Sequence, residues 1–127
     1  MDIRSIETSS AEGVHQNTVQ NWWLFRPREL KQQTSGGYLE LVSEFEVMGG
    51  GAIHPHKHHT LEFYFVLSGR GLMTIENETR LVRQGDLIRI PPDALHSLRS
   101  ESANASIRCL AFSMGLPGTD PVDYVND

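Results

Sequence analysis

The feature that most constrains the fold is an alternation of apolar and polar residues that recurs in short segments along the chain. It is clearest over residues 38–48, where Leu39, Leu41, Ser43, Phe45 and Val47 share one face and glutamates dominate the other. Successive side chains of a β-strand point to opposite faces. A period of two over this length therefore predicts a half-buried strand.

Further short strands are expected along the rest of the chain, at 61–67, 72–75, 79–82, 87–90, 96–99 and 107–114. Glycine, proline and polar residues separate them, as in hairpins and tight turns. Residues 68–71 (Ser-Gly-Arg-Gly) predict a turn, and residues 76–78 predict the bend of a hairpin. A convincing amphipathic helix is missing from the pattern, and residues 28–33 favour one helical turn at most. The whole pattern predicts an all-β sandwich or barrel.

The length of 127 residues fits one domain. Residues 1–20 are polar without a clear period, which predicts a flexible N-terminal arm. The domain is expected over residues 21–115, and residues 116–127, with two prolines and a glycine, predict an irregular tail. At the start of the domain, residues 21–26 hold both tryptophans, a leucine and a phenylalanine, which predicts a buried strand ended by Pro27.

The strand expected at 61–67 has an unusual outer face, which carries Leu61, Phe63, Phe65 and Leu67. A strand that is apolar on its outer side has to be covered. The segment 22–25 and a second copy of the chain are the two candidates for the cover. The second possibility is the reason to expect a homodimer.

Charge and hydropathy exclude several classes of protein. With 11 Lys and Arg against 16 Asp and Glu, the net charge is −5, which argues against a nucleic-acid binder. The sequence has no apolar run near the roughly 18 residues that a membrane helix needs, and residues 1–7 do not resemble a signal peptide. A cytoplasmic location is therefore expected. Cys109 stands in an apolar run, which predicts a buried and inert thiol.

Four of the six histidines lie within residues 54–59. In an extended chain His56 and His58 point the same way, and Glu62 has the same parity. Imidazole and carboxylate are the usual ligands of divalent transition metals, so these three side chains indicate the start of a metal site. The alternative is an exposed, unliganded histidine-rich loop.

Two spaced motifs in the chain resemble those of the cupin family. The first, G-x5-H-x-H-x3-4-E-x6-G, is matched by Gly50, His56, His58, Glu62 and Gly69. The second, G-x5-P-x-G-x2-H-x3-N, is matched by Gly85, Pro91 and His96, with Asp93 at its third position and Ser100 at its last. Asp tolerates turn conformations, so the first departure leaves the turn possible. The resemblance covers about residues 38–114.

This resemblance implies a double-stranded β-helix, the jelly-roll barrel of small single-domain cupins. It implies four metal ligands, His56, His58, Glu62 and His96, of which His96 comes from the resemblance alone. The expected cofactor is one divalent transition metal ion, Fe, Mn, Zn, Ni or Cu. Tyr64 shares the face of Glu62 and is a candidate catalytic residue whose hydroxyl would meet a substrate, with a packed core tyrosine as the alternative.

The function expected from these features is a metalloenzyme acting on a small oxygen-rich substrate, such as a carbonyl, carboxylate or sugar-like molecule. The reaction would be of dioxygenase or of lyase or isomerase type, because the fold alone does not choose among them. The alternative is a small-molecule-binding or sensor protein without catalysis. His54 is expected at the mouth of the site, His59 and Arg89 toward solvent.

Overall fold

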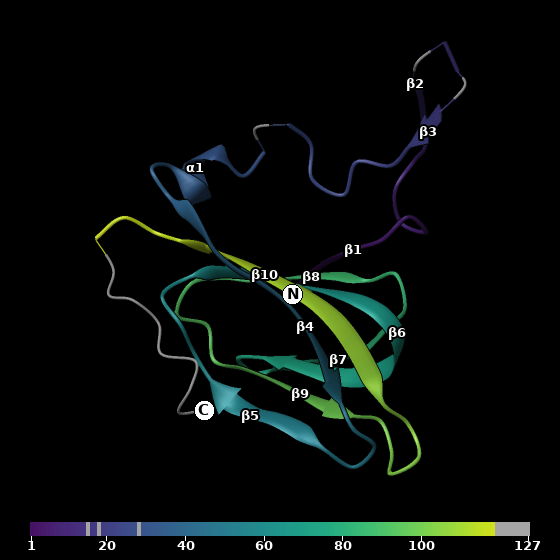
Figure 1. Ribbon diagram of the computed structural model, residues 1–127, viewed down its shortest axis with the longest axis vertical. Coiled ribbons are helices and arrows are strands. Elements are labelled where there is room, and N and C mark those ends of the chain that lie inside the picture. Colours follow the sequence, from purple (N-terminus) through teal and green to yellow (C-terminus); the bar gives the residue numbers. More distant parts are fainter. Residues whose placement is uncertain (15, 18, 28, 119–127) are drawn as a thin grey trace.

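Ten strands and one helical turn are present in the computed structural model, which describes residues 1–14, 16–17, 19–27 and 29–118 (Figure 1). The strands are β1 (Asp2–Arg4), β2 (Glu12–Val14), β3 (Val19–Asn21), β4 (Tyr38–Val47), β5 (Ala52–His56), β6 (Leu61–Ile75), β7 (Glu78–Arg83), β8 (Leu87–Ile90), β9 (His96–Ser100) and β10 (Ile107–Gly115). The turn of helix is α1 (Lys31–Thr34). The prediction of an all-β fold is confirmed, and each strand expected between residues 38 and 114 overlaps an observed one, with 61–67 and 72–75 in the same strand.

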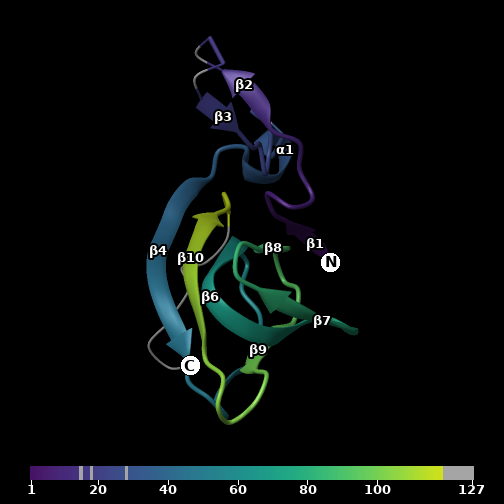
Figure 2. The same ribbon diagram turned by 90° about the vertical axis from the view of Figure 1, so that its right-hand side faces the viewer.

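The strands form two antiparallel layers that share one member. The first layer has the order β1-β8-β6-β10-β4. The second is made by the other half of β6 with β7 on one side and β9 on the other, and β5 continues it beyond β9. Figure 2 shows β4 and β10 on one side of the molecule and β7 and β9 on the other. This is the jelly-roll barrel that the motifs imply.

The shared strand β6 runs without a break through residues 61–75, so the turn expected at residues 68–71 is wrong. Gly69 has a φ of 82°, and the pairing of β10 with β6 shifts register between Arg108 and Cys109. A positive φ together with a bulge bends a strand while its ladder of hydrogen bonds continues. Residues 61–69 therefore pair within the first layer and residues 70–75 within the second.

The space between the layers is filled by the inward-facing residues of both. The fully buried side chains there include Val66, Met73, Ile88, Leu98 and Ile107. Cys109 lies among them with no exposed surface, and burial raises the pKa of its thiol to about 12. The thiol is therefore protonated at neutral pH, which agrees with the expectation of an inert cysteine.

The outer face of β6 is covered by the chain itself. Leu61, Phe63 and Leu87 form a second buried cluster, against which Leu24 and Phe25 pack. The rings of Phe25 and Phe63 meet edge to face with 5.4 Å between centroids. This covering removes the observation on which a homodimer was expected, and the oligomeric state stays a prediction.

The buried strand expected at residues 21–26 is wrong. β3 ends at Asn21, and Trp22 and Trp23 are 38% and 40% exposed. The segment cannot join the first layer beside β8, because β1 occupies that edge. It is held instead by side chains and one carbonyl: the Arg4 guanidinium lies 3.7 Å from the centroid of the Phe25 ring and donates a hydrogen bond of 2.8 Å to the Leu24 carbonyl.

The first 20 residues contain structure that their sequence does not predict. β1 pairs with β8, with Ile3 opposite Ile88, whereas β2 and β3 form a separate hairpin away from the barrel (Figure 1). For residues 2–4 the structure thus differs from the expected flexible arm. Residues 119–127 of the expected tail lie outside the described residues, and the expected boundaries of arm, domain and tail stay predictions. None of the described helices is long and apolar enough to cross a membrane.

Candidate metal centre

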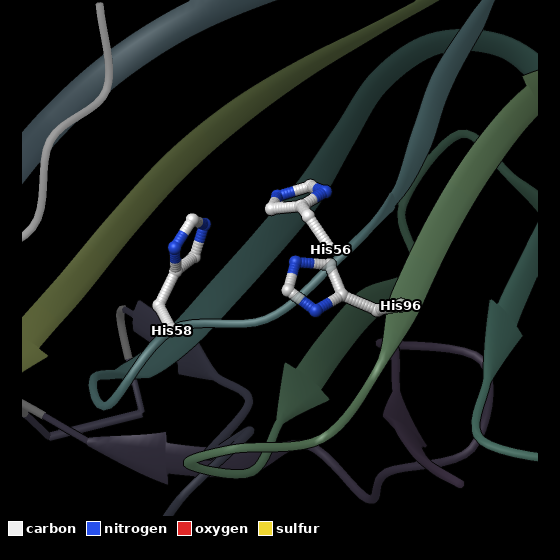
Figure 3. Close-up of side chains that lie close together, drawn as sticks. All are labelled: His56, His58 and His96. Carbon is white, nitrogen blue, oxygen red and sulfur yellow. The ribbon is translucent and has the colours of Figure 1, made fainter. Parts of the chain in front are cut away.

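Three histidines converge from two segments that are far apart in the sequence. His56 ends β5, His58 follows it in the connection to β6, and His96 begins β9 opposite His56. One ring nitrogen from each lies within 4.8 Å of the other two. Figure 3 shows the three rings gathered around a common space. His58 lies beyond the end of the strand, yet its ring still meets that of His56, with 4.6 Å between centroids.

Backbone carbonyls set the orientation of two of these rings. Nδ1 of His56 lies 2.7 Å from the His54 carbonyl oxygen, and Nδ1 of His96 lies 2.9 Å from that of Ala94. A carbonyl oxygen only accepts, so Nδ1 must be the donor in both rings. In the neutral ring this leaves the lone pair on Nε2, which is the nitrogen available to a metal ion.

Glu62 lies next to this cluster on β6. It is 5% exposed, and its Oε1 lies 3.4 Å from Nε2 of His96. Neither atom has a hydrogen-bond partner, although both are buried. A carboxylate oxygen and an imidazole lone pair that face each other in a buried place need a shared cation or proton between them. These donors therefore fit a divalent ion that accepts nitrogen and oxygen ligands.

A cavity of about 540 Å³ adjoins the histidines. Its walls are mostly apolar and come from β4, β5 and β10: Leu41, Phe45, Ala52, Ile53, Pro55 and Ala111. The polar side chains that line it are Ser43, His54, His56, His58, Glu62 and Tyr64. The volume suits a small molecule, since ligand cavities usually measure about 300–1,000 Å³.

Most residues expected near the site are found there. Tyr64 is 4% exposed, lines the cavity and packs edge to face on Phe45 with 5.0 Å between ring centroids. His54 lines the cavity as an exposed residue, which fits its expected place at the mouth. Met73 and Ile75, on the second half of β6, pack in the core and not in the cavity wall.

Arg89 and His59 lie away from the cavity. Arg89 borders a different hollow, which Met1 and Asp2 also line. His59 is exposed, with its Nδ1 2.5 Å from a carboxylate oxygen of Asp93. Asp93 has a φ of 63°, so it adopts the left-handed conformation for which the motif usually provides glycine.

Two buried hydroxyls near Glu62 were not expected from the sequence. Ser113 stands directly opposite Glu62 on β10 and has no exposed surface, and Thr60 ends the connection that leads into β6. Neither Oγ of Ser113 nor Oγ1 of Thr60 has a hydrogen-bond partner. The available signal was weak: Ser113 follows Ile107, Cys109 and Ala111 on the inner face of its strand, where a polar residue has to be explained.

Comparisons with known proteins agree with this architecture. The family model described as Cupin domain matches residues 43–112. An uncharacterized protein of Aquifex aeolicus is 31% identical over 117 residues, which cover 78% of this chain and 95% of that protein. An uncharacterized protein of Methanocaldococcus jannaschii is 42% identical over 78 residues, 61% of this chain and 62% of the relative.

A dimethylsulfoniopropionate lyase of Ruegeria pomeroyi is 40% identical over 72 residues, which cover 56% of this chain and 47% of the lyase. The matched part of this chain therefore spans less than two thirds of the archaeal relative and less than half of the lyase.

Solved structures share the fold. The crystal structure of a predicted oxalate decarboxylase from Thermotoga maritima superposes with a TM-score of 0.58 at 20% identity, covering 72% of this chain and 76% of that one. A cupin protein from Bacteroides fragilis gives a TM-score of 0.55 at 25% identity, over 68% of this chain and 74% of the other.

Proposed function

Since this chain belongs to the cupin family, we propose that it is a metal-dependent enzyme acting on a small molecule rich in carbonyl or carboxylate oxygen. One divalent transition metal ion, Fe, Mn, Zn, Ni or Cu, would be held by His56, His58, Glu62 and His96. The observation that carries the proposal is the convergence of three imidazoles beside a buried carboxylate at the wall of a cavity.

Among the possible reaction types, a lyase-type reaction has the most support. The relative named as a dimethylsulfoniopropionate lyase is 40% identical to this chain over 72 residues. Dioxygenase and isomerase reactions use the same kind of ligand set, so they are the other outcomes of a substrate screen.

The residues of the site have separable tasks in this proposal. A bound divalent ion would supply Lewis-acid chemistry, polarising a substrate oxygen and stabilising negative charge. His56 and His96 are held in the required tautomer by the carbonyls of His54 and Ala94. The apolar walls would contact the uncharged part of the substrate. The Tyr64 hydroxyl would hold or deliver a proton at the substrate, because its ring lines the cavity beside the histidines.

Replacing Tyr64 by phenylalanine tests the last of these tasks. The Tyr64→Phe variant should bind metal within about twofold of the parent, because the ring and its packing on Phe45 remain. Its kcat on the substrate found in a screen should fall by about 100-fold, as expected for loss of a proton-transferring group. A variant with unchanged kcat would show that Tyr64 only packs in the wall.

Metal analysis is the first test of the proposed function. Protein purified without added metal should contain one equivalent of a divalent transition metal, or take up one equivalent on titration. The loaded protein is then screened for turnover and O₂ uptake against small carboxylates, carbonyl compounds and sugars. Absence of a specific metal site would contradict the proposal. Tight binding of a small molecule that survives metal removal, without turnover, would identify a binding protein instead.

A further inference from the structure

We infer that the cavity selects small chelating molecules that carry at most one negative charge and an apolar, uncharged tail. This inference rests on the proposed metal site and adds the chemical class of the molecule that occupies it. Three features of the described residues support it: the charges that line the cavity, the balance of charge at the candidate metal centre, and the apolar side chains of the cavity lining.

Among the described residues, the cavity lining offers no permanently cationic side chain to a second anionic group. None of the described residues that line it is a lysine or an arginine. Arg89 borders a different hollow. Arg108 contacts Glu44 on the exposed face of β4 and β10. The chain as a whole carries a formal net charge of −5, which further disfavours polyanions.

The ligand set itself can neutralise one negative charge. Three neutral imidazoles and the Glu62 carboxylate give a net charge of about +1 with a divalent ion. A bidentate hydroxy- or oxo-carboxylate brings one negative charge, so it would leave the centre neutral. A second carboxylate or a phosphate would lie beside the apolar walls with no lysine or arginine of the lining to pair with, and an unpaired charge beside apolar side chains is unfavourable.

The apolar side chains of the cavity lining offer contact to a substrate. Leu41 and Phe45 project from β4 on one side, and Ile53 and Pro55 line the cavity from β5 on the other. Phe45 is held in place by its edge-to-face contact with Tyr64. A hydrocarbon tail that extends from a metal-chelating head would therefore leave water and contact these side chains, which favours binding.

A series of 2-hydroxy acids tests this selectivity by binding. Protein loaded with Co²⁺ is titrated with lactate, 2-hydroxybutanoate and 2-hydroxypentanoate, and the visible bands of the metal report when an acid reaches it. Affinity should rise about fourfold with each added methylene that enters the cavity. The dianion 2-hydroxyglutarate, which has the same five-carbon chain as 2-hydroxypentanoate, should bind at least about tenfold more weakly than it.

A cation introduced into the wall should reverse the preference. Leu41 lines the cavity, whereas the neighbouring Val42 lies on the opposite face of β4 and is 60% exposed. Leu41→Lys should improve the affinity for 2-hydroxyglutarate relative to 2-hydroxypentanoate by about tenfold. Val42→Lys adds the same charge outside the cavity and should leave this ratio unchanged.

The outcomes separate this inference from the proposed function. If Co²⁺ binds in one equivalent but affinity does not grow with tail length, or the dianion binds as tightly as its monoanionic counterpart, the selectivity is wrong and the metal site stands. A ratio that changes equally in Leu41→Lys and Val42→Lys would also overturn it. Failure of Co²⁺ to bind would overturn both proposals together.

Discussion

Replacing His58 by alanine is expected to remove stoichiometric metal from the protein and to weaken metal binding by about 100-fold or more. His58 follows the end of β5 and contributes one of the three nitrogens that lie within 4.8 Å of one another. Because it lies in a connection and is not part of a ladder of hydrogen bonds, the barrel should fold without it. Metal content after purification and a Co²⁺ titration measure the effect, and circular dichroism verifies the fold.

The neighbouring His59 provides a matched control. It is the same residue type one position along, but it is exposed and contacts Asp93 instead of the cluster. His59→Ala should keep one equivalent of metal with an affinity within about threefold of the parent. Full metal content in His58→Ala, or equal losses in the two variants, would show that the ligand assignment is wrong.

Replacing Gly69 by alanine is expected to destabilise the protein by about 3 kcal/mol or more. The φ of 82° is strained for any residue with a Cβ, and a Cβ at this position would lie 2.0 Å from the Ser106 carbonyl oxygen. That oxygen belongs to the backbone just before β10. The clash can therefore be removed only if β10 shifts relative to β6. Typical domains are stable by only about 5–15 kcal/mol, so chemical denaturation should show that the variant has lost a large part of its free energy of unfolding.

Gly85 separates the steric part of this effect from the conformational part. It has a similar φ of 91°, but a Cβ there would have no neighbour within 4 Å. Gly85→Ala should therefore cost only about 1–2 kcal/mol, the strain of the backbone conformation alone. Equal losses of free energy of unfolding in the two variants would contradict the close approach of Ser106 to β6.

The strands were predictable wherever one face of the sheet meets the core. Alternation identified β4, whose glutamates share the outward face, whereas β10 was expected from its short apolar run. The course of residues 68–71 was not predictable, since the Ser-Gly-Arg-Gly sequence is equally typical of a turn. Only the pairing of β10 across Gly69 makes the chain continue as a strand there.

The segment with both tryptophans was predicted to be a strand and is not one. Its composition favours a buried strand, but a strand also needs a free edge, and β1 takes the edge of β8. Residues 2–4 carry no periodic signal, so the sequence did not reveal that they would pair with β8. Local composition predicted that Leu24 and Phe25 cover something apolar, and they do so without strand geometry.

The candidate site was partly predictable by parity alone. The parity rule placed His56, His58 and Glu62 on one side, and the structure shows the rings of the two histidines in contact. His96 lies 34 residues beyond Glu62 and has no local signal, so it came only from the motif resemblance. Ser113 was missed because its position opposite Glu62 depends on the register between β6 and β10.

The bent course of β6 has a consequence for how the barrel comes apart. One continuous chain segment supplies hydrogen bonds to both layers, so complete separation of the layers requires β6 to lose its pairing in one of them. Glu62 lies on the first half of β6, and His96 pairs with Ile75 at its far end. An ion held by these two side chains would connect the two layers across that bend, so removal of the metal should lower the free energy of unfolding of the barrel.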